Sequence, residues 1–228
     1  MRFFLNAVLI LLSICHSVCA DSWHTAQETK QAELDLHWHT SKPFIQFDSN
    51  DNLIGLEYDL IMAFADFLSK EHGIDLKLNW IEARDFHHIL DSVQFSKAEN
   101  AMGVSAFSIT KERQQYLKFT DTYLPDITVL VSSQGTPIVR NFNEIHHMME
   151  GMQAITIRGT IYESLLLKMK DQIHVDFEIL YIDSDDNVLR HISESDNMFG
   201  FIDLPIYLMW IRDGRNLIRQ NFFTIRGM

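Results

Sequence analysis

Short apolar segments alternate with amphipathic helical segments along the chain, and this alternation limits the folds that are open to it. In the first half, strands are expected at residues 34–37, 74–80 and 101–104. Helices are expected at residues 55–72 and 85–95, where apolar residues recur at helical spacing. The order strand, helix, strand, helix, strand predicts a mainly parallel sheet with helices on its faces. The fold class is therefore expected to be α/β.

The second half repeats the same alternation. Strands are expected at residues 127–132, 153–157, 178–182, 198–202 and 221–225. The helices between them are expected at residues 141–150, 160–169, 183–194 and 204–213.

The length of 228 residues is enough for one large or two small domains. A polar turn at residues 133–137 is interpreted as following a crossover between two lobes. We therefore expect residues 21–130 to form lobe 1, beginning with a polar leader at 21–30. Residues 131–220 are expected to form lobe 2, and residues 221–228 a strand that returns toward lobe 1.

One loop in the middle of the chain carries the residues expected to bind a ligand. Ser105, Ala106, Ser108 and Thr110 are small or hydroxylated, and Arg113 follows them. Small residues let a ligand approach the backbone, and an arginine can hold a carboxylate through two parallel hydrogen bonds. The loop follows a strand, and ligands of open α/β sheets gather at the carboxyl ends of strands. The alternative is that Arg113 is an exposed residue at the start of a helix.

The same loop resembles the signature of the bacterial extracellular solute-binding proteins, family 3, the periplasmic polar amino acid-binding proteins of ABC transporters. The matching residues are Ile109, Thr110, Arg113, Phe119, Thr120 and Tyr123. A Pro43-Phe44 pair and the run from Gly55 to Leu60 add to the resemblance. It implies a two-lobed, type II periplasmic binding protein-like fold, in which each lobe is a mainly parallel sheet flanked by helices. It covers residues 33–228 and implies that further residues, which complete the first lobe in the family, follow there, so the chain is expected to be C-terminally short.

The resemblance also implies a binding site for an amino acid-like zwitterion. Arg113 would bind the α-carboxylate, with Ala106 and Ser108 in the same corner. The Gly159-Thr160 pair would meet that carboxylate from the second lobe, and Asp203 would pair with the α-ammonium group. Each residue of the second lobe has an alternative role, because Thr160 and Asp203 both precede helices and can cap them.

Two departures from the family pattern concern the choice of ligand. Ser41 stands where many members have an aromatic residue, and Trp38 stands where they often have an acid. The stacking platform is therefore absent or supplied by Trp38 or Phe44. We expect a ligand outside the common histidine, arginine, lysine and glutamine set, or weak binding.

The first twenty residues have the features of a secretory signal peptide. Arg2 provides the positive start, residues 3–14 are mostly apolar, and Val18-Cys19-Ala20 ends in small residues. Cleavage after Ala20 would remove both cysteines and place the mature chain in the periplasm. A lipoprotein and an uncleaved anchor are the alternatives.

Composition excludes several other classes. A formal net charge of -12 argues against nucleic acid as a partner, and 46% hydrophobic residues argue against disorder. The sequence has no phosphate-binding loop, dinucleotide fingerprint or catalytic-serine motif. Histidine pairs at residues 87–88 and 146–147 are possible metal ligands, but adjacent histidines are expected to point apart. We expect no cofactor, no metal and a monomer.

Three functions fit these features. The first is a binding protein that closes by a hinge on a small polar solute and is read by an inner-membrane permease. The second is an enzyme on the same scaffold, for which Glu57, Asp59 and Glu163 are the available acids and bases. The third is a sensing module for a membrane receptor. The first is preferred, because no motif supports the acid-base candidates and the chain has no second apolar segment long enough to cross a membrane.

Overall fold

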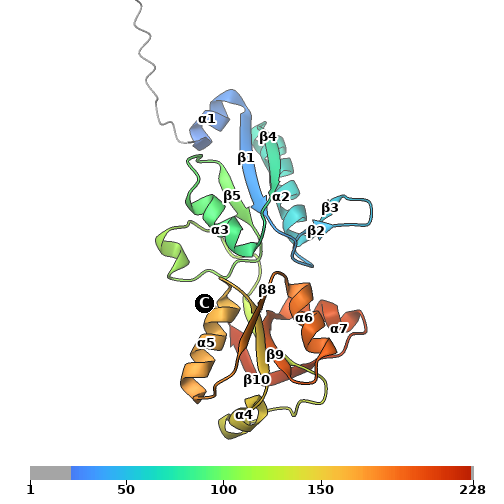
Figure 1. Cartoon of the computed structure of the whole chain (residues 1–228). Helices are drawn as coiled ribbons and strands as arrows, with labels where there is room; N and C mark the ends of the chain where they lie inside the picture. The colour runs from blue at the N-terminus through green and yellow to red at the C-terminus, as the bar shows by residue number, and fades with distance from the viewer. Residues whose placement is uncertain (1–21, 227–228) are drawn as a thin grey trace, which may run out of the picture.

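The computed structural model describes residues 22–226 and has two lobes, which lie one above the other in Figure 1. The first lobe contains a three-stranded sheet in the order β4-β1-β5. Strand β1 is Gln31–Trp38, β4 is Asp75–Glu82 and β5 is Ala101–Val104, and both pairings are parallel. The carboxyl ends of these strands therefore point toward the second lobe.

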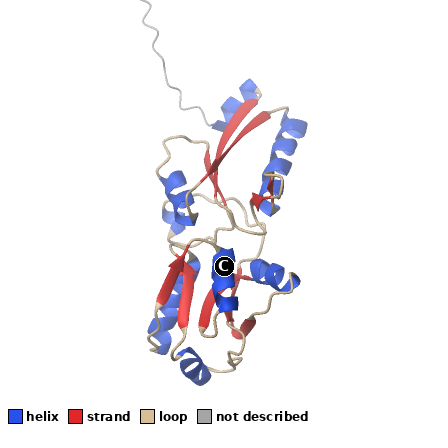
Figure 2. Ribbon diagram, turned by 45° about the vertical axis from the view of Figure 1, so that its right-hand side comes forward, coloured by secondary structure: helices blue, strands red, loops and turns tan. Residues whose placement is uncertain are grey.

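Helices flank this sheet, as Figure 2 shows. They are α1 (Ser22–Thr29), α2 (Leu56–Phe67) with its π-helical extension η1 (Leu68–His72), and α3 (Phe86–Gln94). Strands β2 (Gln46–Phe47) and β3 (Leu53–Ile54) form a small hairpin between β1 and α2.

The polar leader expected at residues 21–30 is instead mostly helix α1. The helix is held by Ala26, which is buried and packs with Leu68 and Ile74. Because a single small side chain makes this contact, the segment has too few apolar residues for periodicity to reveal it.

The second lobe contains a five-stranded sheet in the order β10-β6-β9-β7-β8. Its strands are β6 (Ile127–Ser132), β7 (Gln153–Ile157), β8 (Ile179–Ile182), β9 (Met198–Asp203) and β10 (Ile218–Arg226). Strand β7 pairs in parallel with β8 and β9, whereas β6 pairs antiparallel with β9 and β10.

The helices of this lobe are α4 (Phe142–Met149), α5 (Ile161–Ile173), α6 (Asp185–Glu194) and α7 (Leu204–Arg212). Thr160 and Ser184 cap α5 and α6, since their side chains accept hydrogen bonds from the N–H groups of Glu163 and Asn187. None of the described helices is both long and apolar enough to cross a bilayer.

The connection between the lobes runs along β6 and β10. Strand β6 follows the 105–126 loop of the first lobe, and Ile127 at its start pairs with Arg226 at the end of β10. The end of β10 therefore lies where the chain entered the second lobe. Both strands cross the lobe boundaries expected at residues 130 and 220 while pairing within the five-stranded sheet, and these boundaries stay predictions.

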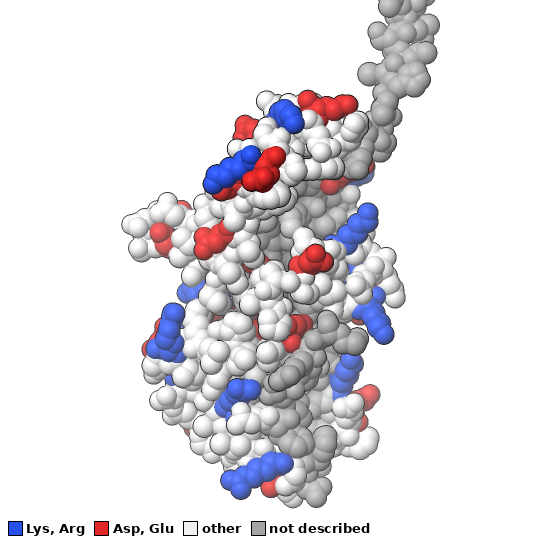
Figure 3. All heavy atoms as spheres, turned by 180° about the vertical axis from the view of Figure 1, so that it is seen from behind, with Lys and Arg blue, Asp and Glu red and all other residues white. Residues whose placement is uncertain are grey.

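The largest apolar core belongs to the second lobe. Phe199, Phe201, Leu130 and Ile155 are among its fully buried side chains. Phe44, from the loop after β1, is also part of this cluster and is buried. A side chain of the first lobe thus packs into the core of the second. On the face seen in Figure 3, acidic and basic side chains are interspersed.

Gly55 fixes the loop that carries Phe44 against the start of α2. Its φ of 129° and ψ of 172° lie in a region that essentially only glycine adopts. A Cβ atom there would lie 2.3 Å from the carbonyl oxygen of Phe44. The neighbouring N–H of Glu57 donates to that same oxygen at 2.9 Å, so a shift of the oxygen would break this hydrogen bond.

The substitution Gly55→Ala is expected to lower the free energy of unfolding by about 3 kcal/mol, because backbone strain and overlap add together. Gly73→Ala is the matched control, since Gly73 also has a positive φ of 63° but nothing within 4 Å of its added Cβ. The control should lose only about 1 kcal/mol. Urea denaturation of both variants measures the difference, and equal losses would contradict the overlap.

Candidate functional site

A small cavity lies between the two lobes at the carboxyl ends of the strands. It offers about 30 Å³ to the centres of water-sized spheres, which is room for about two water molecules. Its lining includes these residues expected from the sequence: Phe44, Ala106, Ser108, Arg113, Thr160 and Asp203. The cavity therefore brings together a cation from one lobe and a carboxylate from the other.

Arg113 is buried at the start of the 3-10 helix η2 (Arg113–Gln115). Its guanidinium donates to the carbonyl oxygen of Ser108 at 2.8 Å and to that of Gly159, in the second lobe, at 3.1 Å. The rings of Phe86 and Phe107 lie 5.9 and 6.0 Å from its Cζ atom, within range for cation–π attraction. Among the side chains that the structure describes, no carboxylate forms an ion pair with Arg113, although the more distant charges of Glu112 and Asp126 favour its ionised form.

The alternative of an exposed arginine is therefore wrong, because Arg113 is only 6% exposed. Burial lowers the pKa of its guanidinium from the usual value. An incoming carboxylate would reverse this effect, since an opposite charge favours the ionised form.

The residues at the start of α5 are already hydrogen-bonded within the second lobe. The Thr160 hydroxyl donates to the carbonyl of Ile157 at 2.7 Å, and the Gly159 N–H donates to Glu163 Oε2 at 2.8 Å. Gly159 contributes its carbonyl to Arg113 and is not among the residues that line the cavity. The capping role of Thr160 is confirmed, whereas contact of Gly159 and Thr160 with a ligand stays a prediction.

Asp203 ends β9 and precedes α7 without capping it by a side-chain hydrogen bond. Burial of its carboxyl raises the pKa to about 7, and the charges of Asp185 and Asp126 act in the same direction. Hydrogen bonds from Tyr162 and Thr128 oppose this rise. A cation that enters the cavity would therefore stabilise the ionised form of this carboxyl.

The sequence did not reveal several residues that line the same cavity. Asp185, Tyr162 and Phe86 are among them, and the sequence marks Ser41 only as a departure from an aromatic residue. Asp185 receives a hydrogen bond from Ser41 Oγ at 3.0 Å across the lobes. Its place at the start of α6 suggested only helix capping, so no local signal could have identified it.

The two candidates for a stacking platform are core residues in this structure. Trp38 is 1% exposed, packs with Leu36, Ile45 and other residues of the first-lobe core, and lies outside the cavity lining. Phe44 lines the cavity but is 2% exposed and packs with the second-lobe core.

The acid-base candidates lie elsewhere. Glu57 is buried and receives a hydrogen bond from Tyr123, and burial raises the pKa of its carboxyl to about 7. Asp59 is exposed, and the carboxylate of Glu163 accepts a hydrogen bond from the N–H of Gly159 at the start of α5. None of the three is among the residues described as lining the cavity.

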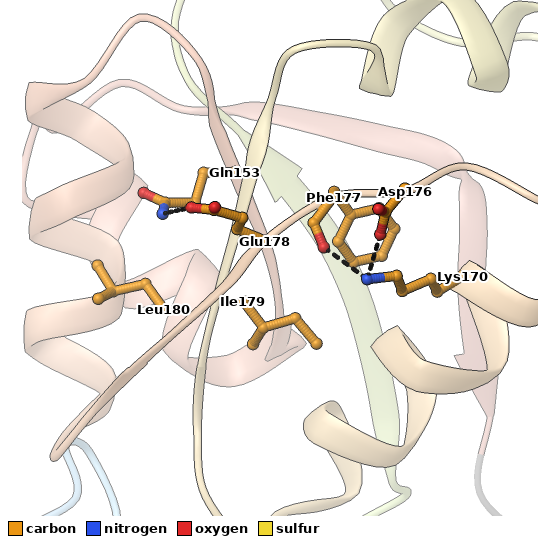
Figure 4. A pocket seen from close by; sticks show the side chains of 7 residues that line it. All are labelled: Gln153, Lys170, Asp176, Phe177, Glu178, Ile179 and Leu180. Atoms are coloured by element: carbon orange, nitrogen blue, oxygen red, sulfur yellow. Dashed lines mark hydrogen bonds and ion pairs between the residues drawn. The ribbon is translucent and has the colours of Figure 1, made fainter.

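Two further features lie outside this cavity. A wide hollow of about 640 Å³ beside β8 is shown in Figure 4, where Lys170 is bound by Asp176 and the carbonyl of Phe177. Its cation is already held by these two groups, and Glu178 accepts a hydrogen bond from Gln153 at 3.5 Å.

The exposed side chains of His146, His147 and Glu150 place ligand atoms within 4.8 Å of one another. The expectation that these adjacent histidines point apart is therefore wrong, because both rings can turn toward the same carboxylate. Three exposed groups at the end of α4 could hold a divalent cation, and the absence of a metal stays a prediction.

The buried carboxyls give the stability of the protein a distinctive pH dependence. The pKa is raised by burial for Asp203 to about 7, for Asp185 from 3.8 to about 6, and for Glu57 from 4.5 to about 7. Between about pH 4 and pH 7 the folded protein therefore binds more protons than the unfolded chain. The free energy of unfolding is expected to fall as the pH rises through this range.

Asp203→Asn should flatten this dependence by up to about 1.4 kcal/mol per pH unit. Urea denaturation at several pH values measures the slope. Asp48→Asn is the control, because hydrogen bonds from Asn52 and Asn50 lower the pKa of Asp48 and place its titration below this range. An unchanged slope in Asp203→Asn would contradict the burial of that carboxyl.

The chain is 28% identical over 148 residues to the lysine/arginine/ornithine-binding periplasmic protein of Escherichia coli K12. The matched segment covers 65% of this chain and 51% of that protein. The chain thus spans about half the length of this curated relative.

Solved structures show the same fold. A putative binding component of an ABC transporter from Wolinella succinogenes, complexed with lysine, has a TM-score of 0.67 at 18% identity and covers 86% of this chain and 79% of its own. The ancestral amino acid-binding protein AncCDT-1, a precursor of cyclohexadienyl dehydratase, has a TM-score of 0.65 at 17% identity and covers 87% and 81%.

The family model described as bacterial extracellular solute-binding proteins, family 3, matches residues 37–198. This range runs from the end of β1 to the first residue of β9 and includes the whole loop that carries Arg113. The chain belongs to the bacterial extracellular solute-binding proteins of family 3.

Proposed function

We propose that the protein captures an amino acid or a similar small zwitterion between its two lobes and presents it to an ABC-type permease of the inner membrane. The observation that carries the proposal is that Arg113 from one lobe and Asp203 from the other line the same cavity. A guanidinium binds a carboxylate well, and a carboxylate binds an ammonium group well. Two such charges facing one space favour a ligand that carries both.

Binding would require movement of the lobes. The cavity has room for about two water molecules, so an amino acid enters only if the lobes separate and close again. Contacts that cross between the lobes, such as Arg113 to Gly159 and Lys42 to Asp186, re-form on closure. The ligand shifts the equilibrium toward the closed form by its higher affinity for that form.

The proposed location is the periplasm, after cleavage of residues 1–20, which lie outside the described part of the chain. Support comes from the apolar run behind Arg2 and from the extracellular character of the family. A permease partner is proposed because the Wolinella protein is described as a component of an ABC transporter. We expect the protein to act as a monomer, with a membrane receptor as the alternative partner.

An enzyme on the same scaffold is the second candidate, because AncCDT-1 is described as the precursor of a dehydratase. A carboxyl with a pKa near 7, such as that of Asp203, can donate or accept a proton at neutral pH. Mass spectrometry of bound ligands after incubation would reveal turnover. Unchanged ligand favours the binding function.

The proposal is tested by thermal shift of the mature chain against amino acids, opines and small dicarboxylates. A binding solute at one hundred times its Kd should stabilise the protein by about 2.7 kcal/mol, which raises Tm by about 5–10 °C. Arg113→Ala should lose this shift.

Arg212→Ala is the matched control. It removes the same charge from an exposed residue that pairs only weakly with Asp213, and it should keep the shift. The role of Arg113 is refuted if a solute stabilises Arg113→Ala as strongly as it stabilises the wild type.

A further inference from the structure

The charges that line the inter-lobe cavity do not match a simple zwitterion. Arg113 is the one cationic side chain described in the lining, whereas Asp185 and Asp203 both contribute carboxylates. A solute with one carboxylate and one ammonium group would satisfy Arg113 and Asp203. The carboxylate of Asp185 would then be left without a cation.

Asp185 is only half satisfied by the protein. Its Oδ2 atom accepts the hydrogen bond from Ser41, but its Oδ1 atom is buried and has no hydrogen-bond partner among the described residues. A buried acceptor without a partner costs about 1–3 kcal/mol. Such an atom in a cavity wall indicates a group that is supplied from outside.

Helix capping does not explain this residue. Ser184 is the N-cap of α6, and its side chain accepts the hydrogen bond from the N–H of Asn187. Asp186, the next residue, forms an ion pair with Lys42 at 2.8 Å, and both of these side chains are about 40% exposed. The carboxylate of Asp185 is thus turned into the cavity, while its neighbour pairs near the surface.

Asp185 and Asp203 line the same small cavity, so their carboxyl groups share one space. The charge of Asp185 raises the pKa of Asp203, and both carboxylates raise the pKa of Tyr162, which lies with them in the cavity lining. Two ammonium groups that pair with these carboxylates must therefore also lie near each other. The small size of the cavity adds to this limit on ligand length.

We propose that the cavity selects a short diamino acid, whose carboxylate binds Arg113 and whose two ammonium groups bind Asp203 and Asp185. Solutes of the 2,3-diaminopropionate and 2,4-diaminobutyrate type have this chemistry. The inference rests on the proposed function, because it assigns the ligand of the same site. It also gives Asp185 a specificity-determining role.

Calorimetric titration of the wild-type mature chain tests the selection directly. The probes are 2,3-diaminopropionate, 2,4-diaminobutyrate, lysine, alanine and serine. One or both short diamino acids should bind about 10- to 100-fold more tightly than alanine or serine, since one further charge-assisted hydrogen bond forms. They should also bind more tightly than lysine, whose second ammonium lies farther from the first.

Three variants separate the role of Asp185 from general effects on closure. Asp185→Asn keeps an acceptor for Ser41 but removes the charge, and it should weaken diamino acids about 10- to 100-fold relative to alanine. Asp186→Asn removes a charge one residue away, and Ser41→Ala removes the inter-lobe contact. Each of these two should change the affinity for all solutes by the same factor.

Three results would overturn the inference. The first is wild-type protein that binds alanine or serine as tightly as the short diamino acids. The second is Asp185→Asn that weakens every solute equally, which would make Asp185 a closure contact only. The third is wild-type protein that binds none of the solutes, which would count against the proposed function as well. The wild-type selectivity decides the matter even if Asp185→Asn fails to fold.

Discussion

The buried guanidinium of Arg113 is the interaction on which the rest of the site depends. It donates to Ser108 in its own lobe and to Gly159 in the other, so one cation is shared by two bodies of the protein. A buried charge costs several kcal/mol unless hydrogen bonds compensate for it. Carbonyl dipoles compensate in part, and an arginine still has further N–H donors to offer a ligand. The site is therefore a property of the closed pair of lobes and not of either lobe alone.

The sequence predicts most of the fold because most helices and strands have a recognisable apolar pattern within their own residues. The strands at residues 101–104, 127–132 and 153–157 were expected with the bounds that the structure shows. The β2–β3 hairpin was not expected, since two-residue strands are too short to show an alternating pattern. Helix α1 was missed for the related reason that a single buried alanine holds it in place.

The candidate site could be predicted only where a residue type and a loop position suffice. Arg113 lies in a loop after a strand and Asp203 ends a strand, and their charges suit the two ends of an amino acid. Asp185 could not be found in this way, because its role depends on Ser41, which precedes it by 144 positions in the chain. Trp38 was a candidate stacking platform because it is aromatic and lies near a binding loop. Such a side chain can equally belong to the core, as Trp38 does.

Phe44 gives the motion of the lobes an energetic bias. Its ring belongs to the loop after β1, yet it packs with the core of the second lobe and is almost wholly shielded from water. Burial of a phenylalanine side chain contributes about 1.5–3 kcal/mol. Separation of the lobes would expose this ring to water, so its burial stabilises the closed form of the protein. Less of the binding free energy of a solute is then needed to hold the lobes together. The same apolar contact opposes the opening through which the solute is released.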